Sequence, residues 1–356
     1  MNLKKIFRWR YGNRLPWVLI LLGGSLMLVL FLASAFGAAK ISFAEVLQMV
    51  LNKTAVFDFP ATWRAVDETI IFQIRMPRVI GGLLVGAALA TAGVLFQGLL
   101  RNPMADPYII GTSAGAALGA TIAMILPINL ALLGFGLVPF TAFVGALLTV
   151  IMVYNLARVG ARTPIISMLL AGFVVSALLA AVVAFIMTIS DRLDLDLRSV
   201  YSFLMGHISV STWGQVAVIA PLVIGGIVAA RFFAYQLNAF SLGEEGAAYL
   251  GIEVERDKLI ILALGSLLTA AAVSISGLVG FVGLVMPHAV RLVLGPDHRL
   301  LLPASALAGA IFVVIADLLA RTLLAPVEIP VGIITALIGA PFFLYLLRHS
   351  RREYAF

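Results

Sequence analysis

Residues 79–100 read VIGGLLVGAALATAGVLFQGLL, and this stretch decides what kind of protein the chain forms. It has no charged side chain and is about as long as the ~20 residues that a helix needs to cross a bilayer. In hydrocarbon, its backbone polar groups must bond to one another, as they do in a helix. The stretch therefore predicts a membrane-spanning helix.

The chain on either side repeats this pattern. The apolar run from Leu259 to Pro287 is too long for one upright helix, and Ser274-Ile275-Ser276-Gly277 is the expected turn within it. Pro326 and Pro330 separate the last two runs, because proline interrupts a helix. Ten spans follow, at about 16–36, 79–100, 109–127, 135–157, 165–188, 214–235, 259–276, 278–294, 300–320 and 331–347. We expect an all-α integral membrane protein in which residues 1–356 form a single transmembrane domain.

Composition supports this class and excludes several functions. Hydrophobic residues make up 62% of the chain and charged residues 12%, which is too little charge to coat a soluble globule. There is no cysteine, so disulfides, thiolate metal sites, iron–sulfur clusters and cysteine nucleophiles are excluded. The net charge of +7 is better explained by basic loops that orient the spans than by a nucleic-acid partner.

The distribution of basic residues predicts the orientation. Ten spans place both termini on one side, and a cytoplasmic N-terminus puts sixteen of the 24 Lys and Arg residues inside. Basic residues gather on the cytoplasmic side of membrane proteins. We therefore expect both termini in the cytoplasm.

Three polar segments interrupt the spans. Segment 37–78 lies outside in this topology and contains an apolar-periodic stretch, Phe43 to Leu51, that predicts an interfacial helix. Segment 189–213 also lies outside and carries Asp191, Asp194, Asp196 and His207; such a cluster is more often a solvated loop than a metal site, so no metal is expected. Segment 236–258 lies inside.

An internal repeat is also expected. An offset of 184 residues aligns Gly93 with Gly277, Pro103 with Pro287 and Ala105 with Ala289. Spans 2–5 would then recur as spans 7–10 with opposite membrane orientation, because an odd number of spans separates the copies. Inverted repeats are common in transporters. The alternative is chance similarity between two apolar segments.

The chain lacks the motifs of the common nucleotide and metal enzymes. It has no G-x-x-x-x-G-K-[ST] loop and no H-E-x-x-H, so an enzyme is not expected. Asp317 is the one clear carboxylate within a span, four residues before Arg321 on one helix face. A local ion pair is favoured there over a proton relay.

Small residues recur at helical spacing. Gly82/Gly86 and Gly111/Gly115/Gly119 are typical of close helix packing. Ser167/Ala171 and Thr335/Gly339 have the same spacing and either pack helices or line a transport pathway.

Several ordered motifs closely resemble the FecCD-type permeases of ABC importers, which serve iron–siderophores, haem and cobalamin. The resemblance covers nearly the whole chain after the first span. The motifs are RMPR (75–78), GGLLVGAALA (81–90), RNPMADP (101–107), GTSAG (111–115), GEEGAAYLG (243–251), GFVGLVMPH (280–288) with Arg291, DHR (297–299), and PVGIIT (330–335) followed by GAP (339–341).

The resemblance implies partners and an energy source outside the chain. It implies a homodimer, two ATPase subunits that bind ATP and Mg²⁺, and a periplasmic or lipid-anchored solute-binding protein, all at a bacterial or archaeal cytoplasmic membrane. No cofactor is expected in this chain, and no nucleic acid. By resemblance, Arg75, Arg78 and Arg321 meet acidic residues of the binding protein.

The resemblance also assigns roles at the inner face. The ATPase would contact a coupling helix, with Glu244, Glu245, Gly246, Ala247, Ala248, Leu250 and Gly251 as its residues. Asn102, Pro103 and Met104, together with Thr163, Pro164, Ile165 and Ile166, would form the cytoplasmic gate. Pro164 stiffens its turn, so which residue there closes the gate stays open.

We therefore expect the permease subunit of an ATP-driven importer for an iron chelate (siderophore or haem) or cobalamin. The alternative is a secondary carrier, built on inverted repeats and driven by an ion gradient. Pathways of the resembled family bind weakly, so the sequence does not choose among these ligands.

Overall fold

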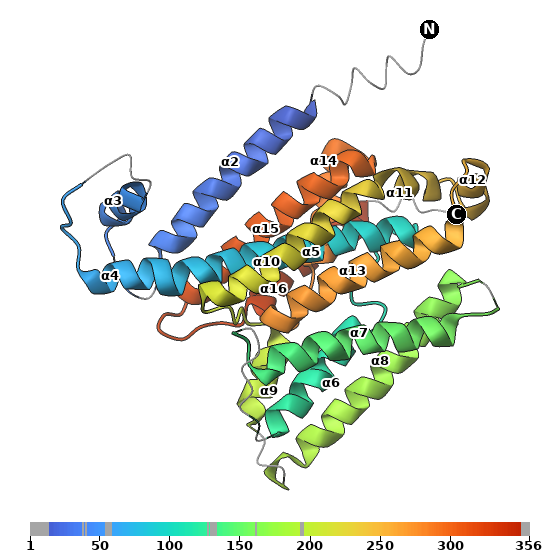
Figure 1. Cartoon of the computed structure of the whole chain (residues 1–356), viewed down its shortest axis with the longest axis horizontal. Coiled ribbons are helices and arrows are strands. Elements are labelled where there is room, and N and C mark those ends of the chain that lie inside the picture. Colours follow the sequence, from blue (N-terminus) through green and yellow to red (C-terminus); the bar gives the residue numbers. More distant parts are fainter. Residues whose placement is uncertain are drawn as a thin grey trace.

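The computed structural model describes residues 14–37, 39, 41–53, 59–126, 128, 134–160, 162–192 and 196–349. Those residues form helices and connecting loops, and the only β pairing among them is one isolated bridge between Val159 and Arg162. The chain is therefore all-α, as the sequence predicts (Figure 1).

A helix occupies each of the ten expected spans. They are α2 (Arg14–Ala35), α5 (Met76–Leu99), α6 (Thr112–Ile125), α7 (Leu137–Ala157), α8 (Ile165–Thr188), α10 (Trp213–Phe232), α13 (Val254–Ser276), α14 (Val282–Leu294), α15 (His298–Thr322) and α16 (Val331–His349). Within the described residues, seven apolar helices are long enough to cross a membrane. The apolar parts of α6, α14 and α16 are shorter, so length alone does not establish ten crossings.

The polar segments carry short helices. The expected interfacial helix is α3 (Phe43–Lys53), and α4 (Ala65–Thr69) follows it. Segment 189–213 contains the 3₁₀ turn η2 (Ser190–Arg192) and α9 (Leu197–Met205). Segment 236–258 contains α12 (Glu244–Tyr249) and most of α11 (Ala234–Phe240), which begins two residues earlier. Figure 1 places α3 and α4 at one end of the molecule and α12 at the opposite end.

Helix α5 lies at the centre of the bundle. Within its apolar stretch 89% of residues are buried, against 17% for α8. Gly86 makes the close approach possible, because a Cβ there would overlap the backbone of Gly309 on α15. Gly93 approaches the backbone of Gly283 on α14 in the same way. Small residues let helix backbones pack directly, which is how membrane helices associate.

The central helix begins earlier than the sequence indicates. Helical structure runs from Ala65 to Leu99 through α4, the π-helical segment η1 (Ile70–Arg75) and α5. Pro77 lies just after the π-helical segment. Proline lacks an N–H and its ring clashes with the carbonyl four residues before it. A π turn at this point accommodates that clash, so the helix continues instead of ending.

Helix α6 is shorter than the expected span 109–127. Residues 101–111 form turns, and Gly111 adopts a left-handed conformation (φ 88°) immediately before the helix. Gly111 therefore does not belong to a helical packing face. Gly115 and Gly119 do, because they approach Gly145, Thr149 and Thr141 on α7.

The residues aligned by the 184-residue offset do not occupy matching places. Gly93 lies inside α5, whereas Gly277 (φ 59°) ends α13. Pro103 lies in a loop and Pro287 inside α14. That register is therefore wrong. The order of helix lengths is nevertheless the same in the two halves, since a long helix is followed by a short one in α5–α6 and again in α13–α14.

Candidate functional site

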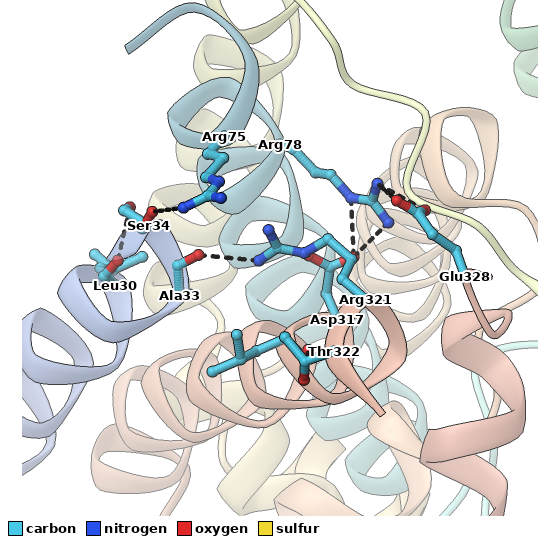
Figure 2. A network of polar contacts seen from close by, with 10 residues as sticks. Leu30, Ala33, Ser34, Arg75, Arg78, Asp317, Arg321, Thr322 and Glu328 are labelled. Atoms are coloured by element: carbon cyan, nitrogen blue, oxygen red, sulfur yellow. Dashed lines mark hydrogen bonds and ion pairs between the residues drawn. The ribbon is translucent and has the colours of Figure 1, made fainter. Parts of the chain in front are cut away.

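A buried carboxylate organises the end of the bundle near α4. Asp317 on α15 is 1% exposed. Its Oδ2 lies 2.9 Å from Arg321 Nε, and its Oδ1 lies 3.0 Å from Arg78 Nη2 and accepts a 3.1 Å hydrogen bond from Arg78 Nε (Figure 2). The expected Asp317–Arg321 ion pair is confirmed, and Arg78 is an additional partner.

Glu328 completes this cluster around Asp317. It lies in the connection between α15 and α16, and its Oε2 is 2.9 Å from Arg78 Nη1. No local sequence pattern points to Glu328 as a partner, because it lies 250 positions from Arg78. Arg78 therefore lies between a buried carboxylate and a half-exposed one.

The other two arginines of the expected docking set are bound to backbone carbonyls. Arg75 is 5% exposed and donates to the carbonyls of Ser34, Ala35 and Ala39. Arg321 is 7% exposed and donates to Ala33 O at 3.0 Å. Both side chains thus tie the end of α2 to the rest of the bundle, as Figure 2 shows. All three predicted docking arginines gather around one pocket of about 280 Å³.

The predicted coupling segment forms a short surface helix, α12. Gly243 (φ 95°) precedes it and Gly251 (φ 80°) follows it, both in conformations that favour glycine. Glu244 and Glu245 lie in its first turn, where the helix dipole favours acidic groups. The segment thus has the form expected of a compact helix between two sharp turns.

The two glutamates of α12 have different surroundings. Glu245 is exposed, whereas Glu244 Oε1 lies 3.1 Å from Nζ of the buried Lys258 on α13. Ala247 is buried and packs the helix onto the molecule. Among the other predicted coupling residues, Ala248, Leu250 and Gly251 are exposed and Gly246 is half-buried. Tyr249, which the predicted set omitted, is 92% exposed.

The two predicted gate segments lie in loops next to helix ends. Asn102, Pro103 and Met104 follow α5, and the Asn102 Oδ1 accepts a 2.9 Å hydrogen bond from Met104 N. Burial raises the pKa of the nearby Asp106 carboxyl, and a hydrogen bond from Tyr108 N opposes that change.

The second gate segment leads into α8. Pro164 is the N-cap of that helix, Thr163 is buried, and Ile165 and Ile166 begin the helix. A cavity of about 20 Å³ touches both Leu99 at the end of α5 and Ile165. The ends of α5 and α8 therefore meet at one small space.

The four predicted pathway residues differ in exposure. Ser167 and Ala171 on α8 are half-buried, and Ala171 packs against the core. Thr335 on α16 is fully buried, and a Cβ at Gly339 would meet Phe281. For Thr335 and Gly339, these contacts favour the packing alternative within the subunit.

The acidic loop 189–213 has a structural explanation. Asp196 caps α9, accepting hydrogen bonds from Arg198 N at 3.0 Å and Ser199 Oγ at 2.6 Å. The Ser199 hydroxyl, followed by the Arg198 N–H, lowers the pKa of this carboxyl. Asp194 lies outside the described residues. Within the ranges given above, no three His, Asp or Glu side chains gather closely enough to hold a metal ion.

Comparison with known proteins assigns the family. Residues 25–349 match the model described as the FecCD transport family. The chain belongs to this family. That match extends over nine-tenths of the chain, from within α2 to the last residue of α16.

Relatives and a solved structure agree with the FecCD assignment. The chain is 46% identical over 311 residues to a cobalamin import system permease protein of Halobacterium salinarum, covering 87% of this chain and 79% of that protein. It is 39% identical to a hemin transport system permease protein of Yersinia pestis, and the match covers 92% of this chain and 95% of that protein. A metal-chelate type ABC transporter solved in an inward-facing conformation superposes with a TM-score of 0.76 at 29% identity, covering 94% of this chain and 99% of that chain.

Proposed function

We propose that this FecCD-family chain is the permease subunit of an ABC importer that passes an iron chelate, haem or cobalamin across the cytoplasmic membrane of a bacterium or archaeon. The family match over residues 25–349 carries the proposal. The similar cobalamin and hemin permeases and the metal-chelate transporter support the ligand class. They favour an importer over a secondary carrier.

The proposed assembly contains two copies of this chain, two ATPase subunits and one solute-binding protein. Residues 1–356 form one transmembrane domain, and the ATPase subunits bind ATP and Mg²⁺. The end with α3 and α4 faces outward, and α12 faces the cytoplasm together with both termini. The separation of α4 and α12 at opposite ends of the molecule supports this orientation.

The outer cluster of Arg75, Arg78, Arg321, Asp317 and Glu328 is the proposed docking site for the binding protein. Of the three arginines, Arg78 is the best placed to contact the binding protein directly. Its side chain is 15% exposed, and one of its two carboxylate partners, Glu328, is 42% exposed. An incoming carboxylate can replace Glu328 at Arg78 without unpairing Asp317. Arg75 and Arg321 support this site by holding α2 and α15 in place.

At the inner face, α12 is the proposed coupling helix and the loops before α6 and α8 form the proposed gate. The exposed Glu245, Tyr249 and Leu250 are available to the ATPase. Ser167 and Ala171, on the peripheral helix α8, are the proposed pathway residues. The large exposed apolar surface of α8 supports a position against lipid, a second subunit or the pathway.

Reconstitution tests the function directly. The permease is assembled with its ATPase subunits in liposomes, and ATP hydrolysis is measured with binding protein loaded with haem, a ferric siderophore or cobalamin. We expect one loaded form to stimulate hydrolysis and to deliver its ligand into the lumen. Transport by the permease alone along an ion gradient would instead establish the secondary carrier.

A further inference from the structure

The buried side chain of Lys258 joins α12 to the segment before α8. Lys258 Nζ lies 3.1 Å from Glu244 Oε1 on α12 and 2.8 Å from Glu255 Oε1 on its own helix, α13. The other oxygen of Glu255, Oε2, accepts a 3.0 Å hydrogen bond from Thr163 N. A continuous chain of polar contacts therefore runs from α12 through α13 to the loop before α8.

A neighbouring ion pair on α13 shows what is distinctive about Lys258. Arg256 and Glu253 have the same three-residue spacing, but their side chains are 68% and 70% exposed and their charged atoms lie 3.4 Å apart. Such exposed pairs contribute little. The Lys258 side chain is only 10% exposed, so its charge depends on the two carboxylates that replace water.

The empty space beside Lys258 is small. Lys258, Glu255 and Thr163 border the cavity of about 20 Å³ that also touches Leu99 and Ile165. That space holds about one water molecule. Closely packed interiors transmit a displacement instead of absorbing it. The Lys258 partner of Glu244 therefore borders the same small space as the ends of α5 and α8.

We propose that Lys258 and Glu255 are positioning residues that transmit movement of α12 to the gate segment Thr163–Ile166. The inference rests on the proposed function, in which the ATPase moves α12. When α12 is displaced, Lys258 follows Glu244 and carries Glu255 and Thr163 with it. Separation of these groups would leave a buried charge without its partner.

A single reporter can follow the gate segment. The chain has no cysteine, and the Ile166 side chain is 73% exposed, so Ile166→Cys introduces one accessible thiol. The permease is assembled with its ATPase subunits in nanodiscs. The rate of maleimide labelling is measured without nucleotide and after trapping with ATP and vanadate. We expect nucleotide to change this rate about fivefold or more, which is the lower end of ordinary allosteric coupling.

Substitutions in the Ile166→Cys chain then test this relay, the transmission of movement from α12 through Lys258 and Glu255 to the gate segment, separately from assembly with the ATPase. In Lys258→Met and Glu255→Gln, we expect the two labelling rates to converge while the ATPase still co-purifies and hydrolyses ATP. Glu255→Gln keeps an acceptor for Thr163 N and loses the charge that pairs with Lys258. Lys258→Arg should restore the nucleotide response, and the matched control Arg256→Gln should leave it unchanged.

Two outcomes distinguish failure of the relay from failure of the proposed function. If Lys258→Met and Glu255→Gln keep the full nucleotide response, the relay is overturned and the coupling role of α12 stands. If the Ile166→Cys chain without further substitution binds no ATPase, or its labelling rate does not change with nucleotide, the coupling role of α12 fails and the relay fails with it. Where Lys258→Met does not fold, an unchanged response in Glu255→Gln is sufficient to overturn the relay.

Discussion

Asp317 is the residue on which the outer cluster depends most. It is buried between Arg78 and Arg321, so Asp317→Asn removes the carboxylate that forms ion pairs with both arginines. Breaking a buried pair in this way costs about 3–5 kcal/mol. We expect a clear fall in the thermal unfolding temperature of the detergent-purified protein. Glu328→Gln is the matched control, because this half-exposed partner of Arg78 should contribute about 0–1 kcal/mol. Equal losses from both substitutions would contradict the central role of Asp317.

Tyr249 tests the exposed side of α12. An aromatic ring that is 92% exposed on a short surface helix is suited to a protein interface, where tyrosine is enriched. We expect Tyr249→Ala to weaken ATPase binding about tenfold, as truncation of an interface hot spot does. Binding is measured by titrating the ATPase onto permease in nanodiscs. Trp17→Ala, at an exposed aromatic on α2, should have no effect.

Substitutions of the two glutamates in the first turn of α12 should differ in their effects. Glu245→Arg places a positive charge on the exposed face of α12 and should reduce ATPase co-purification without changing permease stability. Glu244→Gln instead removes one partner of the buried Lys258, so it should lower the unfolding temperature. Identical effects of the two substitutions on stability would argue against this division.

At the scale of elements, the contact between α5 and α15 depends on small residues. Gly86→Ala inserts a methyl group against the Gly309 backbone, and overpacking of this kind costs about 1–3 kcal/mol. We expect a lower unfolding temperature in detergent. At Gly225 on α10 a Cβ meets nothing within 4 Å, so Gly225→Ala should be neutral or stabilising by up to about 1 kcal/mol. Destabilisation by Gly225→Ala equal to that by Gly86→Ala would show that the contact with Gly309 is not the cause of the loss.

At the scale of the whole molecule, α4 and the proposed coupling helix α12 lie at opposite ends of one bundle (Figure 1). Charge complementarity affects association rate more than affinity, and salt screens it. We expect Arg78→Gln to slow binding-protein association at low ionic strength and to flatten its salt dependence. The rate is measured by stopped-flow fluorescence at several salt concentrations. Arg64→Gln, at an exposed arginine near α4 paired with Asp67, is the control, and an equal effect of both would indicate nonspecific attraction.

The sequence alone determined the all-helical membrane class, the places of the apolar helices, the presence of a helix at α3 and the FecCD family. These features depend on hydropathy and motifs within short stretches, where neighbouring residues share one environment. Tertiary structure decided the partners of the charges. Arg78 meets Asp317 across 239 positions. Lys258 pairs with Glu244 and Glu255, and Glu255 accepts a hydrogen bond from Thr163 N across 92 positions. Side chains so far apart in sequence meet only after the helices pack, so local periodicity cannot distinguish the buried Lys258 from the exposed Arg256 two residues before it.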